Sequence, residues 1–174
     1  GDGTGQFQWP SCIAQDSQEN IYISDEQLNR INVFSNDGTP FKHWGETGSD
    51  QGSFDGPSGI ALDDDDNLYI ADHRNHRVQK FTKDGVFISC FGDSRSSDPL
   101  NMPWGVTVSP NGDVYVADWG NSQVKRYSSD GQFVSCYGEP GSGDGQLKNP
   151  SGVAVDKDGY VYVTDWGNER LQIF

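Results

Sequence analysis

The side chains with the clearest metal-binding chemistry are three histidines and a run of aspartates. His73 and His76 lie three residues apart, with His43 further upstream, and imidazole is the commonest metal ligand in proteins. Residues 63–66 are four consecutive aspartates, which offer the oxygen ligands that calcium prefers. The run lacks the alternating spacing and the distant Glu of a calcium loop. We therefore interpret it as a solvated turn and expect neither a metal site nor a cofactor.

Four tryptophans form a second group with binding chemistry. An indole offers a flat apolar face and one hydrogen-bond donor, so it can stack on a sugar ring or contact a protein partner. His73 and Arg74 fall at positions equivalent to two of these tryptophans or next to them. Because Trp119 and Trp166 are each followed by Gly, they could instead fill gaps between neighbouring structural units. The candidate binding residues are Trp9, Trp104, Trp119, Trp166, His73 and Arg74.

A third group of charged residues recurs along the chain. An aspartate that closes an apolar segment is followed five residues later by an arginine that opens the next, with Gln123 replacing the arginine once. Such a pair can tie down the turn between two strands. Because it recurs, we interpret it as structural and predict no catalytic residue. The group comprises Asp25, Asp72, Asp118 and Asp165 with Arg30, Arg77 and Arg170.

These recurrences follow one period. The four aspartates are 47, 46 and 47 residues apart, and Pro10, Pro57, Pro103 and Pro150 keep the same spacing. Each period holds four short segments rich in β-branched and aromatic residues, separated by turns of Asp, Asn and Gly. No window has apolar residues at helical spacing. Each copy is therefore predicted to be a four-stranded antiparallel sheet, except that the last copy ends after its third strand.

A single four-stranded sheet cannot bury both of its faces, whereas copies stacked around an axis can. Four strands in each repeat of roughly 40–45 residues are typical of β-propeller blades. The fold prediction is all-β: a single propeller segment over residues 1–174. The predicted blades span approximately residues 7–45, 54–92, 100–138 and 147–174.

The repeated phrases resemble a known family. Pro-Ser-Gly-Ile-Ala from Pro57, Asn-Leu-Tyr-Ile-Ala-Asp from Asn67 and Asn-x-Arg-Val-Gln-x-Phe from Asn75 are similar to the NHL repeat, as is Asp-Gly-x-Phe from Asp84. The resemblance implies a six-bladed propeller, which at this period needs roughly 280 residues. The chain has 174. It is therefore expected to be part of a longer propeller, with an open array completed by other chains and a compact four-bladed ring as alternatives.

The net charge of the chain disfavours some classes of binding partner. Twenty-six acidic residues against 12 basic ones give a net charge of −14, which disfavours nucleic acids and anionic membrane surfaces. The basic stretch from His73 to Lys80 is interpreted as solvated strand and loop. No apolar segment approaches the ~18 residues of a transmembrane span, and no signal peptide is visible. Resemblance to microbial NHL proteins gives a weak preference for a secreted or cell-envelope location.

The three cysteines are predicted to be free, small and partly buried. Cys90 and Cys136 hold equivalent positions in successive copies, so their Cα atoms should be further apart than the ~7 Å that a disulfide allows. Cys12, on a predicted first strand, replaces the Gly of the other copies.

The functional hypothesis is a non-enzymatic propeller that serves as a protein-binding or assembly scaffold, completed by a protein partner or further blades. One alternative is carbohydrate binding through the Trp side chains. The family also includes amidating lyases with a histidine-ligated zinc. A further alternative is therefore a lyase or hydrolase whose catalytic residues lie in blades outside this sequence.

Overall fold

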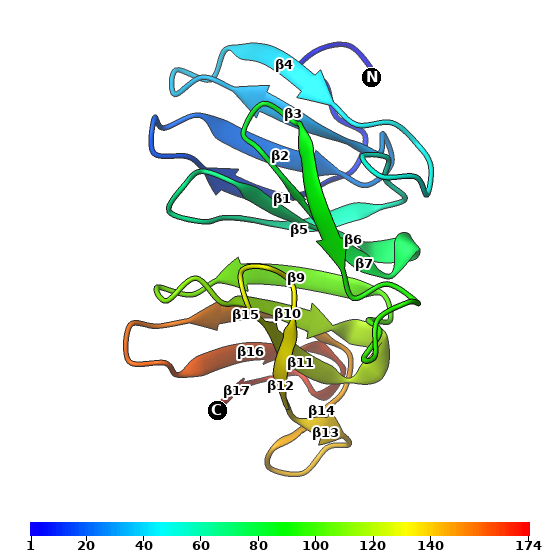
Figure 1. Ribbon diagram of the computed structural model, residues 1–174, viewed down its shortest axis with the longest axis vertical. Helices are drawn as coiled ribbons and strands as arrows, with labels where there is room; N and C mark the ends of the chain where they lie inside the picture. The colour runs from blue at the N-terminus through cyan, green and yellow to red at the C-terminus, as the bar shows by residue number, and fades with distance from the viewer.

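Four antiparallel sheets follow one another in chain order as the blades of a β-propeller (Figure 1). The computed structural model describes residues 1–174. Within each sheet the strands lie side by side in sequence order, and the first strands of successive blades pack together: β1 with β5, β5 with β9, and β9 with β15. The first strand of each blade is therefore the innermost. The all-β propeller prediction is confirmed.

The strands of the four blades match the predicted segments closely. The first blade contains β1 (Pro10–Gln15), β2 (Ile21–Asp25), β3 (Arg30–Phe34) and β4 (Pro40–Trp44). The second contains β5 (Pro57–Leu62), β6 (Leu68–Asp72), β7 (Arg77–Phe81) and β8 (Phe87–Phe91). The third contains β9 (Pro103–Val108), β10 (Val114–Asp118), β11 (Gln123–Tyr127) and β12 (Phe133–Tyr137). The fourth contains β15 (Pro150–Val155), β16 (Val161–Asp165) and β17 (Arg170–Ile173).

The remaining elements are short. A parallel pair, β13 (Glu139–Pro140) and β14 (Gln146–Leu147), lies in the linker between the third and fourth blades. Single 3-10 turns follow the second strands of the last three blades: η1 (His73–Asn75), η2 (Trp119–Asn121) and η3 (Trp166–Asn168). No helix is long or apolar enough to cross a membrane. As predicted, no α-helix is present.

The hydrophobic core lies between blades rather than inside them. Side chains alternate along a strand, so Leu68 and Ile70 of β6 pack in the cluster shared with the first blade, whereas Tyr69 packs in the cluster shared with the third. A third cluster, which includes Leu147 and Val163, joins the third and fourth blades. The middle blades therefore bury both faces.

The outward faces of the first and fourth blades are open. Ile13 is 64% exposed, and Leu171 and Ile173 are each 57% exposed. No packing comparable to that between successive inner strands joins β1 to β15. The two ends of the chain lie at opposite ends of the molecule in Figure 1.

The three thiols are free, as predicted. Cys12 and Cys90 are half-buried. Cys136 on β12 is exposed rather than partly buried, whereas Cys90 at the equivalent position of β8 has Arg95 Nη2 4.0 Å from its Sγ.

Inner strands approach one another most closely at two glycines. A Cβ atom at Gly59 would lie 2.4 Å from the carbonyl oxygen of Trp104, and one at Gly105 would lie 2.6 Å from that of Ser151. Both neighbours are backbone atoms of the next inner strand, which cannot rotate away. Cys12 occupies the equivalent position in the first blade, where its Sγ lies 3.9 Å from the Ile60 carbonyl. The spacing of the later inner strands therefore depends on glycine.

This geometry predicts that Gly59→Ala lowers the free energy of unfolding by about 1–3 kcal/mol, since β5 and β9 must separate to admit the methyl group. Urea unfolding followed by Trp fluorescence measures the loss. Cys12→Ala is the matched control at the equivalent position, and it should cost less because it removes an atom without adding one. Equal midpoints of urea unfolding for the Gly59→Ala variant and the wild-type protein would contradict the prediction.

Candidate functional site

A buried aspartate at the end of each second strand holds the surrounding turns. In the second blade, Asp72 is fully buried. Its Oδ1 accepts the backbone N–H of Asp55 at 2.8 Å, and its Oδ2 accepts Asn75 Nδ2 at 2.9 Å and Arg77 Nε at 2.8 Å. Burial raises the pKa of the Asp72 carboxyl, although these hydrogen bonds oppose the effect. One carboxylate thus fixes both the linker before β5 and the turn after β6.

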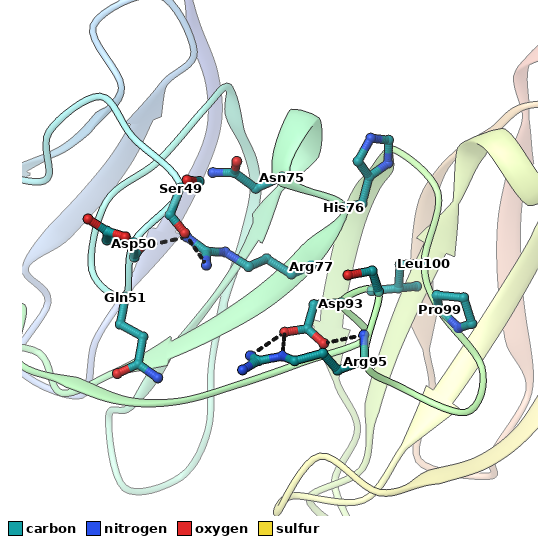
Figure 2. Close-up of a pocket in the computed structure, with 11 residues that line it drawn as sticks. Ser49, Asp50, Gln51, Asn75, His76, Arg77, Asp93, Arg95, Pro99 and Leu100 are labelled. Atoms are coloured by element: carbon teal, nitrogen blue, oxygen red, sulfur yellow. Dashed lines mark hydrogen bonds and ion pairs between the residues drawn. The ribbon is translucent and has the colours of Figure 1, made fainter.

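The arginine extends this arrangement into the linker between blades. The Arg77 guanidinium donates to the carbonyl oxygens of Ser49 and Asp50 at 2.8 Å (Figure 2). It also donates to the carbonyl oxygen of Ser53 at 2.9 Å. Five donors in a rigid plane suit this role, because they can serve the carboxylate and several carbonyls at once. The linker is therefore wrapped around a single cation.

The fourth blade repeats the arrangement. Asp165 accepts the backbone N–H of Lys148 at 2.7 Å, Asn168 Nδ2 at 2.8 Å and Arg170 Nε at 2.9 Å. Burial opposes ionisation here too, but these partners outweigh it and lower the pKa of the Asp165 carboxyl. The predicted Asp–Arg tie is present in the second and fourth blades.

In the first blade that prediction is wrong. Arg30 makes no ion pair with Asp25, and its guanidinium binds linker carbonyls instead. Leu28 stands where the second blade has Asn75, and its side chain has no donor for the carboxylate. Backbone N–H groups satisfy Asp25 in its place, from Gln8, Trp9, Gln27 and Leu28.

In the third blade the cation comes from a position that the sequence analysis missed. Gln123 replaces the arginine, and Lys125 Nζ lies 3.2 Å from Asp118 and 3.1 Å from Asp98. Lys125 is only 2% exposed and also donates to the Pro99 carbonyl at 2.7 Å. Residues two apart share one face of a strand, so the positive charge has moved by one step along that face of β11. The signal was visible in the sequence, because the second and fourth blades have glutamine at this position.

We expect Lys125→Gln alone to destabilise the protein by about 3–5 kcal/mol, because it leaves the buried Asp118 without a cation. Adding Gln123→Arg recreates the arrangement of the second blade and should recover most of the loss. Urea unfolding of both single variants and the double variant gives the coupling energy. Additive effects of the two substitutions would show that the charge has not simply moved along the strand.

The residue after each buried aspartate lies at the same end of the propeller. In the last three blades these residues are His73, Trp119 and Trp166, and in the first blade Glu26. His73, Trp119 and Trp166 line a cavity of about 460 Å³, which we call the Trp cavity. Its lining is His73, Met102, Trp104, Trp119, Ser151 and Trp166. The structure thus brings four of the six candidate binding residues together.

A β-bulge places Trp104 in this cavity. Pro103 pairs with Asp118 and Val106 with Val116, so two residues of β9, Trp104 and Gly105, face one residue of β10. Bulges redirect side chains out of the regular alternation. The indole contacts the His73 ring edge to face, with centroids 4.8 Å apart. The other blades have serine at the position of Trp104.

His73 joins two blades. Its Nδ1 lies 3.2 Å from the Pro103 carbonyl oxygen, which can only accept, so Nδ1 carries the hydrogen. Burial lowers the pKa of the His73 imidazole below its ordinary value and so favours the neutral ring, in which Nε2 is an acceptor.

The other two candidates lie outside the Trp cavity. Trp9 is 64% exposed on the first blade. Arg74 is exposed and forms an ion pair with Asp55 at 3.2 Å. The three cavity tryptophans also differ in exposure: Trp166 is 66% exposed, whereas Trp104 and Trp119 are half-buried.

The histidines and the acidic run have separate structural partners. His76 Nδ1 accepts the backbone N–H of Met102 at 3.0 Å, while His43 lies on the outer strand β4. Asp63 accepts the N–H groups of Asp65 and Asn67 within its own turn. No group of three or more His, Cys, Asp or Glu side chains is placed to hold a metal ion.

A second cavity of about 590 Å³ lies between the linkers that flank the second blade (Figure 2). Its lining is mostly polar, and sequence analysis did not single it out. The cations in its wall are already paired: Arg77 with Asp72, and Arg95 with Asp93 through an Nε–Oδ2 contact of 3.0 Å. With its charges satisfied internally, this cavity is a weaker candidate than the Trp cavity.

Repeated four-stranded blades and a cavity at one end define the chain as a β-propeller. The family model of the NHL repeat matches residues 54–81, 100–127 and 147–174, so the chain is an NHL-repeat protein. The first blade has the same strand order but is outside the matched residues. No curated protein matches the chain.

Solved structures share the fold at low identity. Virginiamycin B lyase from Staphylococcus aureus superposes with a TM-score of 0.72 and 18% identity, covering 97% of this chain and 56% of that chain. The nidogen/laminin complex gives 0.74 and 21%, covering 95% and 60%. Hydrazine synthase from Kuenenia stuttgartiensis gives 0.69 and 14%, covering 99% and 52%. The chain therefore spans just over half the length of these structures, and the likeness shows the fold alone.

Proposed function

We propose that this propeller is a non-enzymatic protein-binding module whose binding face is the Trp cavity. The observation that carries the proposal is the convergence of three indoles, from the third and fourth blades, on one cavity of about 460 Å³. Exposed aromatic clusters are uncommon on soluble proteins and are enriched in interfaces. The open faces of the first and fourth blades offer a second means of assembly with further blades.

The cavity lacks the groups that most catalysis needs. No carboxylate, lysine, arginine or cysteine is in its lining. Its polar side chains are His73, held by Pro103, and Ser151, whose Oγ lies 3.0 Å from Thr164 Oγ1. General acid–base chemistry needs a proton donor and acceptor placed together at the reacting group. Binding a partner requires no such pair of groups, only a surface that is complementary to the partner.

The same composition favours protein over carbohydrate. A sugar presents hydroxyl groups around the rim of its ring, and a site that holds one needs polar side chains in that plane as well as an aromatic face. Besides the indole N–H groups, only His73 and Ser151 can supply them here. The apolar walls suit the side chain of a protein partner better. The likeness to a chain of the nidogen/laminin complex is consistent with this proposal.

Rigidity also favours binding. The turns that carry Trp119 and Trp166 are held by the buried carboxylates of Asp118 and Asp165. The cavity walls are thus fixed before a ligand arrives, which reduces the entropy lost on association.

A lyase remains the alternative from another class. Its support is the fold likeness to virginiamycin B lyase, at 18% identity. Incubating the protein with a streptogramin B antibiotic and following the loss of the intact antibiotic by chromatography tests this alternative. Turnover abolished by a single substitution would favour the lyase over the binding module.

Peptide display on the wild-type protein tests the main proposal. Selected peptides should bind the Trp166→Ala variant at least about tenfold more weakly, because one wall of the cavity is gone. The side chain is 66% exposed, so the core is untouched. Trp9→Ala, which removes an equally exposed indole outside the cavity, is the matched control. Peptides that bind both variants as tightly as wild type would place the binding face elsewhere.

A further inference from the structure

The Trp cavity has the composition of a cation receptor. From it we infer that the cavity is an aromatic cage for an alkylammonium group, namely the side chain of a lysine, free or N-methylated, on a protein partner. This inference deepens the proposed function and rests on it. It is argued from the arrangement of the rings, from the charges around them and from the groups that the lining lacks.

The rings stand apart from one another around the cavity. The only close ring pair in the lining is the edge-to-face contact of His73 with Trp104. Trp119 and Trp166 make no ring pair with each other or with Trp104. No aromatic ring therefore covers the faces of Trp119 and Trp166, and a cation over an indole face gains more than over any other aromatic side chain.

No positive charge competes for the cavity. Burial favours the neutral form of His73, and the cations on neighbouring segments are engaged: Arg74 with Asp55 and Arg170 with Asp165. Lys148, which packs beside Gly167, is exposed and does not line the cavity. A cationic guest would meet no resident charge of its own sign in the walls.

Negative charge lies close by. Glu26 holds the position in the first blade that His73 holds in the second, so its carboxylate lies at the same end of the neighbouring blade. The Glu26 carboxylate accepts Ser11 Oγ at 2.6 Å and is only 8% exposed. The chain as a whole carries −14. Such a field raises the local concentration of cations at the cavity mouth.

Other guests fit less well. An anion would find no free cationic donor in the lining, and a sugar would leave most of its hydroxyl groups unpaired. A neutral apolar group of the same shape is the closest competitor, because it would fill the same space. The alkylammonium guest and the neutral group differ only in charge, so comparing the affinities of a charged and a neutral probe distinguishes them.

Choline and 3,3-dimethylbutan-1-ol have the same shape and differ in charge. Titration of the full chain, followed by Trp fluorescence and by the indole N–H resonances, should show choline binding about tenfold or more tightly than the neutral alcohol. Trp166→Ala should weaken choline binding about tenfold, Trp166→Phe should restore part of it, and Trp9→Ala should leave it unchanged. Equal affinity for the two probes, or no binding of choline, would overturn the inference.

Peptides identify the source of the cation. A peptide with one trimethyllysine should bind more tightly than choline and more tightly than the same peptide with a neutral isostere, if the partner is a protein. Choline binding without any gain from the peptide would keep the cage but contradict the protein source and the proposed function. Display-selected peptides that bind through leucine or phenylalanine, while choline fails, would overturn the cage and leave the proposed function standing.

Discussion

The structure depends on satisfying a carboxylate that each blade buries. An aspartate closes every second strand, and Asp25, Asp72, Asp118 and Asp165 are all fully buried. An ionised group in such a place must be paired and hydrogen-bonded, or its desolvation would cost several kcal/mol. The backbone N–H of the preceding linker supplies one partner in every blade. The same carboxylate consequently holds both the linker and the turn after the second strand.

This constraint also explains where the binding face lies. The residue that follows the aspartate has its backbone fixed by the buried carboxylate, so its side chain is delivered to the same place in each blade. Glu26, His73, Trp119 and Trp166 are therefore four different side chains on one repeated frame. The bulge that admits Trp104 at a position occupied elsewhere by serine completes the set. The residues that repeat in every blade thus form the frame, and the residues that differ between blades at these few positions form the Trp cavity.

Sequence alone predicted the frame well. The period, the prolines that open each inner strand and the alternation of apolar residues predicted the repeated antiparallel sheets, because the side-chain period of a strand is read directly from the order of residues. The convergence of His73, Trp119 and Trp166 was anticipated from their equivalent positions, and that of Trp104 from its place beside an opening proline. The placement of Trp9 and Arg74 was not, because their exposure depends on what packs beside them: Trp9 stands on the open first blade, and Arg74 turns to Asp55.

The order of residues therefore determined the repeat, the strands and the buried aspartates, all of which depend on local periodicity and on burial of one apolar face against another. Only the tertiary structure decided which cation meets each aspartate. Lys125 pairs with Asp118, and Arg77 pairs with Asp72. Arg30 does not pair with Asp25, which accepts backbone N–H groups instead. It also decided that three indoles surround one space. The reason is physical: such partnerships depend on side-chain reach across a turn or between blades, to within an ångström or so, and spacing along the chain does not carry that information.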